Sequence, residues 1–150
     1  MKKIIIILFA CAFVFSANAQ NLKESDVPSA VKNTFSSMYP NVTNAKWEME
    51  NGKYEAEFKE NSVETSVLFE ANGTYTQTEV EIAVSLLPSG VNDYVTKKFR
   101  DSKITEAAKI TSSNGTVTYE AEIGKSDYLF DSNGNFLKKE TDSGDTEDEK

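Results

Sequence analysis

Residues 46–60 read KWEMENGKYEAEFKE, with apolar and charged side chains alternating on both sides of Asn51-Gly52. Alternation with a period of two is typical of a β-strand that buries one face and exposes the other. Asn-Gly between two such runs is a strong hairpin signal, because both central residues of a type I′ turn need positive φ. The stretch therefore predicts two antiparallel strands with one apolar face and one acidic face.

The same pattern returns in the second half of the chain. Residues 119–123 read YEAEI where residues 54–58 read YEAEF, and further Asn-Gly pairs stand at 72–73, 114–115 and 133–134. The first and third of the four pairs are 63 residues apart, and the second and fourth are 61 apart. Repetition at a nearly fixed offset indicates that one structural unit is present twice.

Each unit begins with a predicted helix. In residues 27–38 and 87–99 apolar side chains recur every three or four positions, which places them on one helical stripe. Pro40 ends the first helix, because the residue before a proline is disfavoured in the helical conformation. The two stripes consist of Val27, Val31, Phe35 and Met38, and of Leu87, Val91, Val95 and Phe99.

Four short alternating runs follow each helix, so each unit is predicted as one helix followed by a four-stranded antiparallel meander. We expect an α+β fold with both helices on one face of the sheet. The units, residues 20–82 and 83–140, form one compact domain in this interpretation, because the joining segment 80–86 is apolar. The side chains expected under the helices are Trp47, Tyr54, Phe58, Val67, Phe69, Val117, Tyr119, Ile123, Tyr128 and Phe130.

Two positions need separate comment. Trp47 shares the parity of Ala45 and Met49, so core packing is favoured, with ligand stacking as the alternative. In the second unit, Ile104, Ala108 and Ile110 mark the apolar side of the first strand.

Both ends of the chain are predicted to lie outside the fold. Residues 1–19 have the basic start, apolar middle and small residues of a signal peptide, with cleavage after Ala19 and a mature chain that begins at Gln20. The alternative is a lipoprotein that is lipidated on Cys11. Residues 141–150 hold no apolar side chain and predict a disordered acidic tail, or alternatively an acidic docking peptide.

The inventory of side chains excludes most enzyme classes. The sequence has no His, and its only cysteine, Cys11, lies in the predicted signal peptide. Catalysis by Ser-His-Asp or Cys-His and ordinary zinc sites need these residues, and no phosphate-binding or dinucleotide-binding glycine motif occurs. We therefore expect no catalytic residue, no cofactor and no metal. A pair of carboxylates for glycoside hydrolysis is the alternative that remains.

One acidic constellation stands out on the predicted outer face of the sheet. Without Lys2 and Lys3 the chain has 14 basic and 24 acidic residues, a net charge of −10, so nucleic acid and anionic membranes are not expected partners.

The acids on the predicted outer face of the sheet are interpreted as the solvated side of a half-buried sheet, or alternatively as a surface for a basic partner or a cation. Residues 131–135 have a faint calcium-loop pattern, which is interpreted as a hairpin turn. The candidate interaction residues are Glu48, Glu55, Glu57, Glu64, Glu120 and Glu122, and Glu50 shares their parity.

Taken together, the signal peptide, the Val/Leu-Pro-x-x-Val helix starts, Tyr39-Pro40, Trp47 and the Tyr-Glu-Ala-Glu strands resemble the PepSY-like proteins of Bacteroidetes, also described as beta-lactamase-inhibitor-like. The resemblance covers residues 27–140, although Arg100 stands in the second unit where Pro40 stands in the first. It implies small secreted proteins whose helix-and-strand units present a sheet surface to a partner, and it carries over no catalytic residue.

The expected function is thus a non-catalytic secreted or periplasmic binding or inhibitory module, whose partner would be a periplasmic protein such as a peptidase. A small-ligand or cation-binding periplasmic protein is the alternative. Stable membrane insertion is not expected, because the apolar run of the signal peptide is shorter than the roughly 20 residues that span a bilayer.

Overall fold

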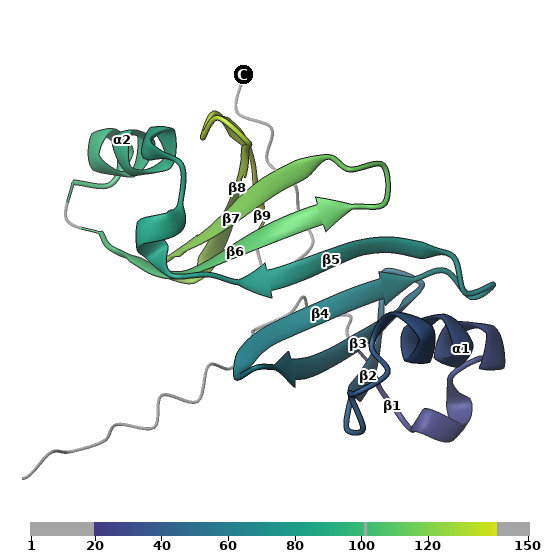
Figure 1. Ribbon diagram of the computed structural model, residues 1–150. Coiled ribbons are helices and arrows are strands. Elements are labelled where there is room, and N and C mark those ends of the chain that lie inside the picture. Colours follow the sequence, from purple (N-terminus) through teal and green to yellow (C-terminus); the bar gives the residue numbers. More distant parts are fainter. Residues whose placement is uncertain (1–19, 101, 141–150) are drawn as a thin grey trace, which may run out of the picture.

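The computed structural model describes residues 20–100 and 102–140, and the predicted signal peptide, its cleavage after Ala19 and the acidic tail lie outside these residues. The described part is an α+β fold: nine antiparallel strands form one sheet in chain order, β1 to β9, with two α-helices (Figure 1). This agrees with the predicted fold class. The strands are β1 (Gln20–Leu22), β2 (Lys46–Glu50), β3 (Lys53–Glu60), β4 (Val63–Phe69), β5 (Tyr75–Glu81), β6 (Ile104–Ser112), β7 (Val117–Ile123), β8 (Ser126–Asp131) and β9 (Phe136–Glu140).

Helix α1 (Ser29–Met38) connects β1 to β2, and α2 (Ser89–Lys98) connects β5 to β6. Each follows a short 3-10 turn, η1 (Glu24–Asp26) or η2 (Val84–Leu86). The sheet passes from one half of the chain to the other without a break, because β5 pairs with β6 from Gln77 to Glu81. Figure 1 shows the two helices at opposite ends of this strongly twisted sheet.

Both helices pack on the same face of the sheet. Residues directly opposite each other on neighbouring strands share a face, and one row of such neighbours leads from the core under α1 to the core under α2. At one end of the row, Thr65 lies on the same side of β4 as Val67, which belongs to the core under α1. At the other end, Phe130 belongs to the core under α2. The row consists of Thr65, Val80, Lys109, Tyr119 and Phe130.

Aromatic side chains fill the core under α1. Phe35 is at the centre, with its ring 5.2 Å from that of Trp47 and 5.4 Å from that of Phe58, both in edge-on arrangements. Trp47 is buried, so its predicted place in the core is confirmed. Edge-on aromatic contacts of this kind each contribute about 0.5–1.5 kcal/mol beyond the burial of area. Met38, the last residue of the predicted stripe, is instead 39% exposed at the end of the helix.

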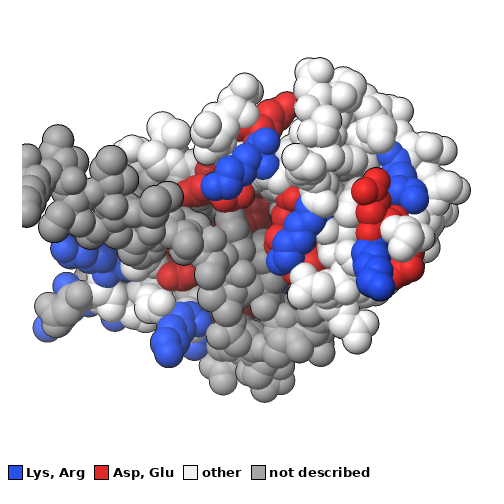
Figure 2. All heavy atoms as spheres, turned by 90° about the horizontal axis from the view of Figure 1, so that it is seen from below, with Lys and Arg blue, Asp and Glu red and all other residues white. Residues whose placement is uncertain are grey.

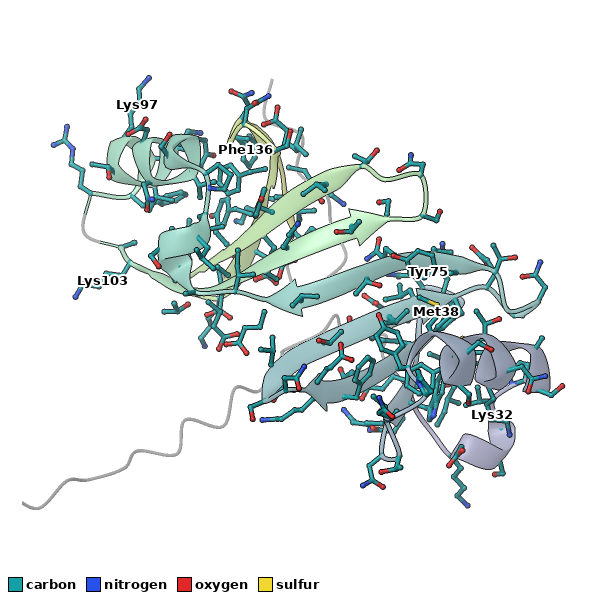
Figure 3. The ribbon with its side chains drawn as sticks, in the orientation of Figure 1. Lys32, Met38, Tyr75, Lys97, Lys103 and Phe136 are labelled. Atoms are coloured by element: carbon teal, nitrogen blue, oxygen red, sulfur yellow. The ribbon has the colours of Figure 1, made fainter. Side chains whose placement is uncertain are left out.

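The core under α2 is built from smaller helix residues. Val91 and Val95 are buried where the first helix has Val31 and Phe35. The aromatic partners come from elsewhere: Tyr94 stacks on Phe136 of β9, with ring centroids 4.9 Å apart and planes at 7° (Figure 3). In the joining segment Ile82 and Val84 pack against this core, whereas Leu86 is exposed.

The first strand of the second half contains a register shift that the sequence pattern did not indicate. Between Ile104 and Ala107 the pairing with β7 slips, so that Ala107 joins the core under α2. Ala108 and Ile110, which share the sequence parity of Ile104, are buried on the opposite face, beside Glu120 and Glu79. A bulge of this kind reverses the side of every residue that follows it.

The four Asn-Gly pairs all lie in hairpin turns, but only the first has the predicted type I′ geometry. Asn51 and Gly52 both have positive φ, at 47° and 79°. At the other three pairs only the glycine has positive φ. Each of these pairs lies in a longer loop, in which the glycine amide donates a hydrogen bond to the carbonyl three residues earlier. In the last of these loops the Asp131 carboxylate accepts from the amides of Asn133 and Asn135. Residues 131–135 thus form a hairpin turn, as predicted.

Two of these hairpins touch the helices. A Cβ on Gly73 would lie 2.6 Å from the carbonyl oxygen of Ala30 in α1, and a Cβ on Gly134 would lie 2.8 Å from the Val91 amide nitrogen in α2. Both glycines also have positive φ. The same hairpin-to-helix contact therefore fixes the first turn of each helix to the sheet.

Candidate functional site

The helix-free face of the sheet carries most of its carboxylates, and we call it the acidic face. Its residues are defined by strand parity and register, and they come from seven strands of the described chain. Of the candidate residues, Glu48, Glu55, Glu57, Glu64, Glu120 and Glu122 lie on it as predicted. The acids that the printed strand register places on it are Glu48, Glu50, Glu55, Glu57, Glu64, Glu79, Glu81, Glu120, Glu122, Asp127, Asp131 and Glu140.

The acidic face is the concave side of the sheet. Glu50 lies on β2 and Glu140 on β9, with six strands between them. Even so, after burial the Glu140 carboxylate is the largest influence that raises the pKa of Glu50. Charges repel measurably only across a short distance in salt solution. The two ends of the sheet must therefore curl toward each other around this face.

The acidic face is not the solvated surface that the sequence predicted. Glu48, Glu55 and Glu79 are buried, with 5%, 0% and 6% of their surfaces exposed, and the other predicted acids are half-buried. Two features explain this difference. The sheet curls, and buried apolar side chains lie directly across the strands from the acids: Leu68 is opposite Glu55, and Ile110 is opposite Glu79.

Three carboxylates come together at the β2–β3 hairpin. Glu48 lies directly opposite Glu55, and Glu57 follows Glu55 on the same face of β3. One oxygen from each carboxylate lies within 4.8 Å of the others. We call Glu48, Glu55 and Glu57 the carboxylate trio. Lys46 borders it, pairing with Glu48 and, at 3.2 Å, with Glu57.

Glu55 is the unusual member of the trio. Neither of its carboxylate oxygens has a hydrogen-bond partner in the described structure, nor does the hydroxyl of the nearby Ser66. Burial, followed by the charge of Glu50, raises the pKa of Glu55 to about 8, and the nearby Ser66 hydroxyl opposes this rise. An unpartnered buried carboxylate is costly, so Glu55 tends to hold a proton or to attract a cation.

A second acidic pair lies where the two halves meet. Glu79 of β5 and Glu120 of β7 flank β6, and Oε1 of Glu79 has no hydrogen-bond partner in the described structure. Burial raises the pKa of Glu79 to about 8. Burial, followed by the charge of Glu79, raises the pKa of Glu120 well above its usual range. Glu79 is not predictable from the sequence pattern, because the alternation in β5 is polar on both sides and gives no sign of which side is buried.

The remaining predicted residues do not join either group. Glu64 pairs with Lys59 at 2.6 Å, and the hydroxyl of Thr105 donates to the Glu122 carboxylate. On the surface drawn in Figure 2, acidic and basic side chains also lie beside each other rather than in patches of one sign. In the described part of the chain, the buried carboxylates with an oxygen that lacks a hydrogen-bond partner are therefore Glu55 in the trio and Glu79 in the Glu79–Glu120 pair.

Chemically, this face can bind protons and positively charged groups. All its ionisable donors are carboxylates and lysines, and the chain contains no imidazole. None of the helices in the described part of the chain is long and apolar enough to cross a membrane.

The fold and this face define a class of small α+β proteins, in which one curled antiparallel sheet carries helices on its outer face and charged groups on its inner face. The chain belongs to the family described as "Putative beta-lactamase-inhibitor-like, PepSY-like", whose profile matches residues 15–73 and 52–138. The resemblance noted in the sequence is confirmed by this match. No curated protein matches the chain significantly.

Solved structures from Bacteroides share the fold. One from Bacteroides eggerthii, described among "putative periplasmic proteins", has a TM-score of 0.67 at 19% identity, over 76% of this chain and 88% of that one. A DUF2874 family protein from Bacteroides ovatus has a TM-score of 0.65 at 21% identity, over 75% and 86%. A BLIP-like protein from Bacteroides fragilis has a TM-score of 0.60 at 23% identity, over 75% and 85%.

Proposed function

We propose that this protein is a non-catalytic binding module of the periplasm that receives a positively charged segment of a partner protein on its acidic face. The observation that carries the proposal is the burial of carboxylates without partners on the concave side of the sheet, at Glu55 and Glu79. Such groups are retained at a cost in stability, and a ligand of opposite charge offsets that cost.

Charge and shape both favour a basic ligand. The acidic face carries more acids than lysines, and an excess of charge of one sign on a concave surface accelerates the approach of oppositely charged ligands. The chain as a whole has a formal net charge of −8, which adds to the same attraction. A segment rich in Lys and Arg would meet these carboxylates with charge-assisted hydrogen bonds.

Binding, rather than catalysis, is supported by the chemistry of the side chains. The sequence contains no imidazole that could act as a general base, and the family is described by likeness to an inhibitor. A periplasmic location agrees with the predicted signal peptide and with the description of the Bacteroides eggerthii relative. We also infer that the two halves, each a helix with four strands, are copies of one ancestral unit.

A titration with a basic peptide tests the proposal. The probe is a fluorescein-labelled octalysine peptide, followed by anisotropy at 50 mM and 300 mM NaCl. We expect saturable binding that weakens at the higher salt concentration. A variant that neutralises three half-buried acids of the face, Glu50→Gln, Glu122→Gln and Glu140→Gln, should bind about tenfold more weakly.

The matched control removes three acids that are exposed elsewhere, by the substitutions Glu24→Gln, Asp26→Asn and Asp93→Asn. It makes the net charge less negative by the same amount and should change the affinity less than about twofold. If both triple variants lose affinity equally, only net charge matters and the acidic face is not the binding surface. Absence of saturable binding at 50 mM NaCl would also contradict the proposal.

A small-ligand or cation-binding protein is the second candidate. Of these two kinds of ligand, the geometry of the carboxylate trio favours the cation.

A further inference from the structure

We propose that Glu48, Glu55 and Glu57 form a binding site for a hard divalent cation, of which Ca²⁺ is the best fit. Three carboxylates from two neighbouring strands converge here. Glu55 is 0% exposed, is aimed into the cluster and lacks a partner for either oxygen in the described structure. This inference goes beyond the proposed function, because the ion needs no partner protein.

The donor set selects the kind of ion. All three side chains offer carboxylate oxygens, which are the ligands of Ca²⁺ and Mg²⁺ rather than of softer metals. Oxygens on opposite sides of a Ca²⁺ ion, at 2.3–2.6 Å from it, are roughly 5 Å apart, whereas around Mg²⁺ they are roughly 4 Å apart. The trio oxygens lie within 4.8 Å of one another, so they fit the coordination sphere of Ca²⁺ without moving.

The charge balance also leaves room for a cation. Lys46 supplies one positive charge for three carboxylates, and its ammonium pairs with Glu48 and Glu57. It does not satisfy Glu55, whose oxygens remain without hydrogen bonds. Lys46 is mostly exposed, so its side chain can swing toward solvent when an ion enters. The raised pKa of Glu55 reflects the same uncompensated burial.

The second half of the chain provides an internal control. In the first half, Glu48 of β2 lies opposite Glu55 of β3. In the second half, Ala108 of β6 lies opposite Glu120 of β7. Ala108 therefore occupies the place of Glu48. Glu122 then corresponds to Glu57, and it accepts a hydrogen bond from Thr105. The second half has no acid in the place of Glu48, and among the described residues only the trio brings three carboxylates within 4.8 Å of one another, so we expect one site and not two.

Thermal unfolding with CaCl2 as the probe tests the site. We compare the purified protein in 10 mM CaCl2 with the same protein in NaCl at equal ionic strength. For a Kd of about 1 mM, usual for extracellular calcium modules, Tm should rise by about 4 °C. Glu55→Gln should abolish this rise, because a neutral amide keeps the shape and removes the charge. Glu120→Gln, the matched change in the other half, should keep it.

Two outcomes would overturn the inference: no rise in Tm for the unsubstituted protein, or an equal rise in Glu55→Gln and in the unsubstituted protein. If Glu55→Gln fails to fold, Glu57→Gln serves instead, since Glu57 is half-buried and sits at the edge of the trio. The octalysine titration is independent of this measurement. A chain that binds Ca²⁺ but no peptide refutes the proposed function alone, and the reverse result refutes the cation site alone.

Discussion

The two halves of this protein keep the same helix-covered face and differ on the acidic face. Under the helices, Val31 and Val91 are both fully buried, and Gly73 and Gly134 approach their helices in the same way. On the acidic face, Glu48 of the first half corresponds to Ala108 of the second. The comparison teaches that packing fixes one side of the repeated unit, whereas the other side is free to acquire a function in one copy.

The cores themselves differ in one important position. Phe35 occupies in α1 the place of Val95 in α2, and both are buried. We expect Phe35→Ala to lower the free energy of unfolding by about 3–5 kcal/mol, because it empties the centre of an aromatic cluster. Val95→Ala removes a smaller side chain and should cost about 2 kcal/mol. Urea unfolding measures both, and equal losses would show that the two cores do not differ in this way.

The hairpin contact should be equally important in both halves. Gly73→Ala and Gly134→Ala each place a Cβ within 3.0 Å of helix backbone, at a residue with positive φ. We expect each to cost about 3 kcal/mol, of which about 1 kcal/mol comes from φ and the rest from the clash. Gly115→Ala is the control, since it has positive φ but open space, and it should cost only about 1 kcal/mol. Urea midpoints that are the same for all three variants would rule out the contact.

Glu79 of β5 and Glu140 of β9 occupy corresponding places in the two halves, but β5 lies in the middle of the sheet and β9 at its edge. The folded protein holds a proton on Glu79 up to a pKa of about 8, while an ordinary glutamate releases it near 4.5. Stability from this group is therefore present below about pH 4.5 and lost as pH rises toward 8. Glu79→Gln should reduce this loss and stabilise the protein at pH 8 by about 1–2 kcal/mol.

Glu140→Gln is the matched control, because Glu140 is half-buried and pairs with Lys138. Urea midpoints at pH 5 and pH 8 give the comparison. A pH dependence that is unchanged by Glu79→Gln, or reduced as much by Glu140→Gln, would contradict this explanation. Glu55 and Glu120 act in the same direction, so some pH dependence should remain in either variant.

The smallest expected effect concerns Lys46, which has no basic counterpart in the second half, where Glu106 stands at the corresponding position of the sequence. If Lys46 competes with the ion at the trio, Lys46→Gln should tighten Ca²⁺ binding about twofold to fivefold, as expected for a mostly exposed ion pair. Lys53→Gln, which breaks a pair with Glu70 outside the trio, should leave the affinity unchanged. Weaker Ca²⁺ binding by Lys46→Gln in a calorimetric titration would show that the lysine supports the site instead.

The sequence predicted what depends on local pattern. Alternation on both sides of Asn51-Gly52 placed Trp47 and Phe58 in the core and the acids on the other face. It could not predict the burial of Glu55 and Glu79, because the curl of a nine-stranded sheet depends on contacts between strands far apart in the chain. The bulge that turns Ala108 and Ile110 to the acidic face was also hidden, since a register shift leaves the composition of a strand unchanged.

The difference between the halves is tested most directly by the number of Ca²⁺ ions bound per chain, measured by isothermal titration calorimetry. We predict one ion for the unsubstituted protein, one for Glu120→Gln and none for Glu55→Gln. Two ions in the unsubstituted protein, or one ion retained by Glu55→Gln, would rule out a single site at the trio.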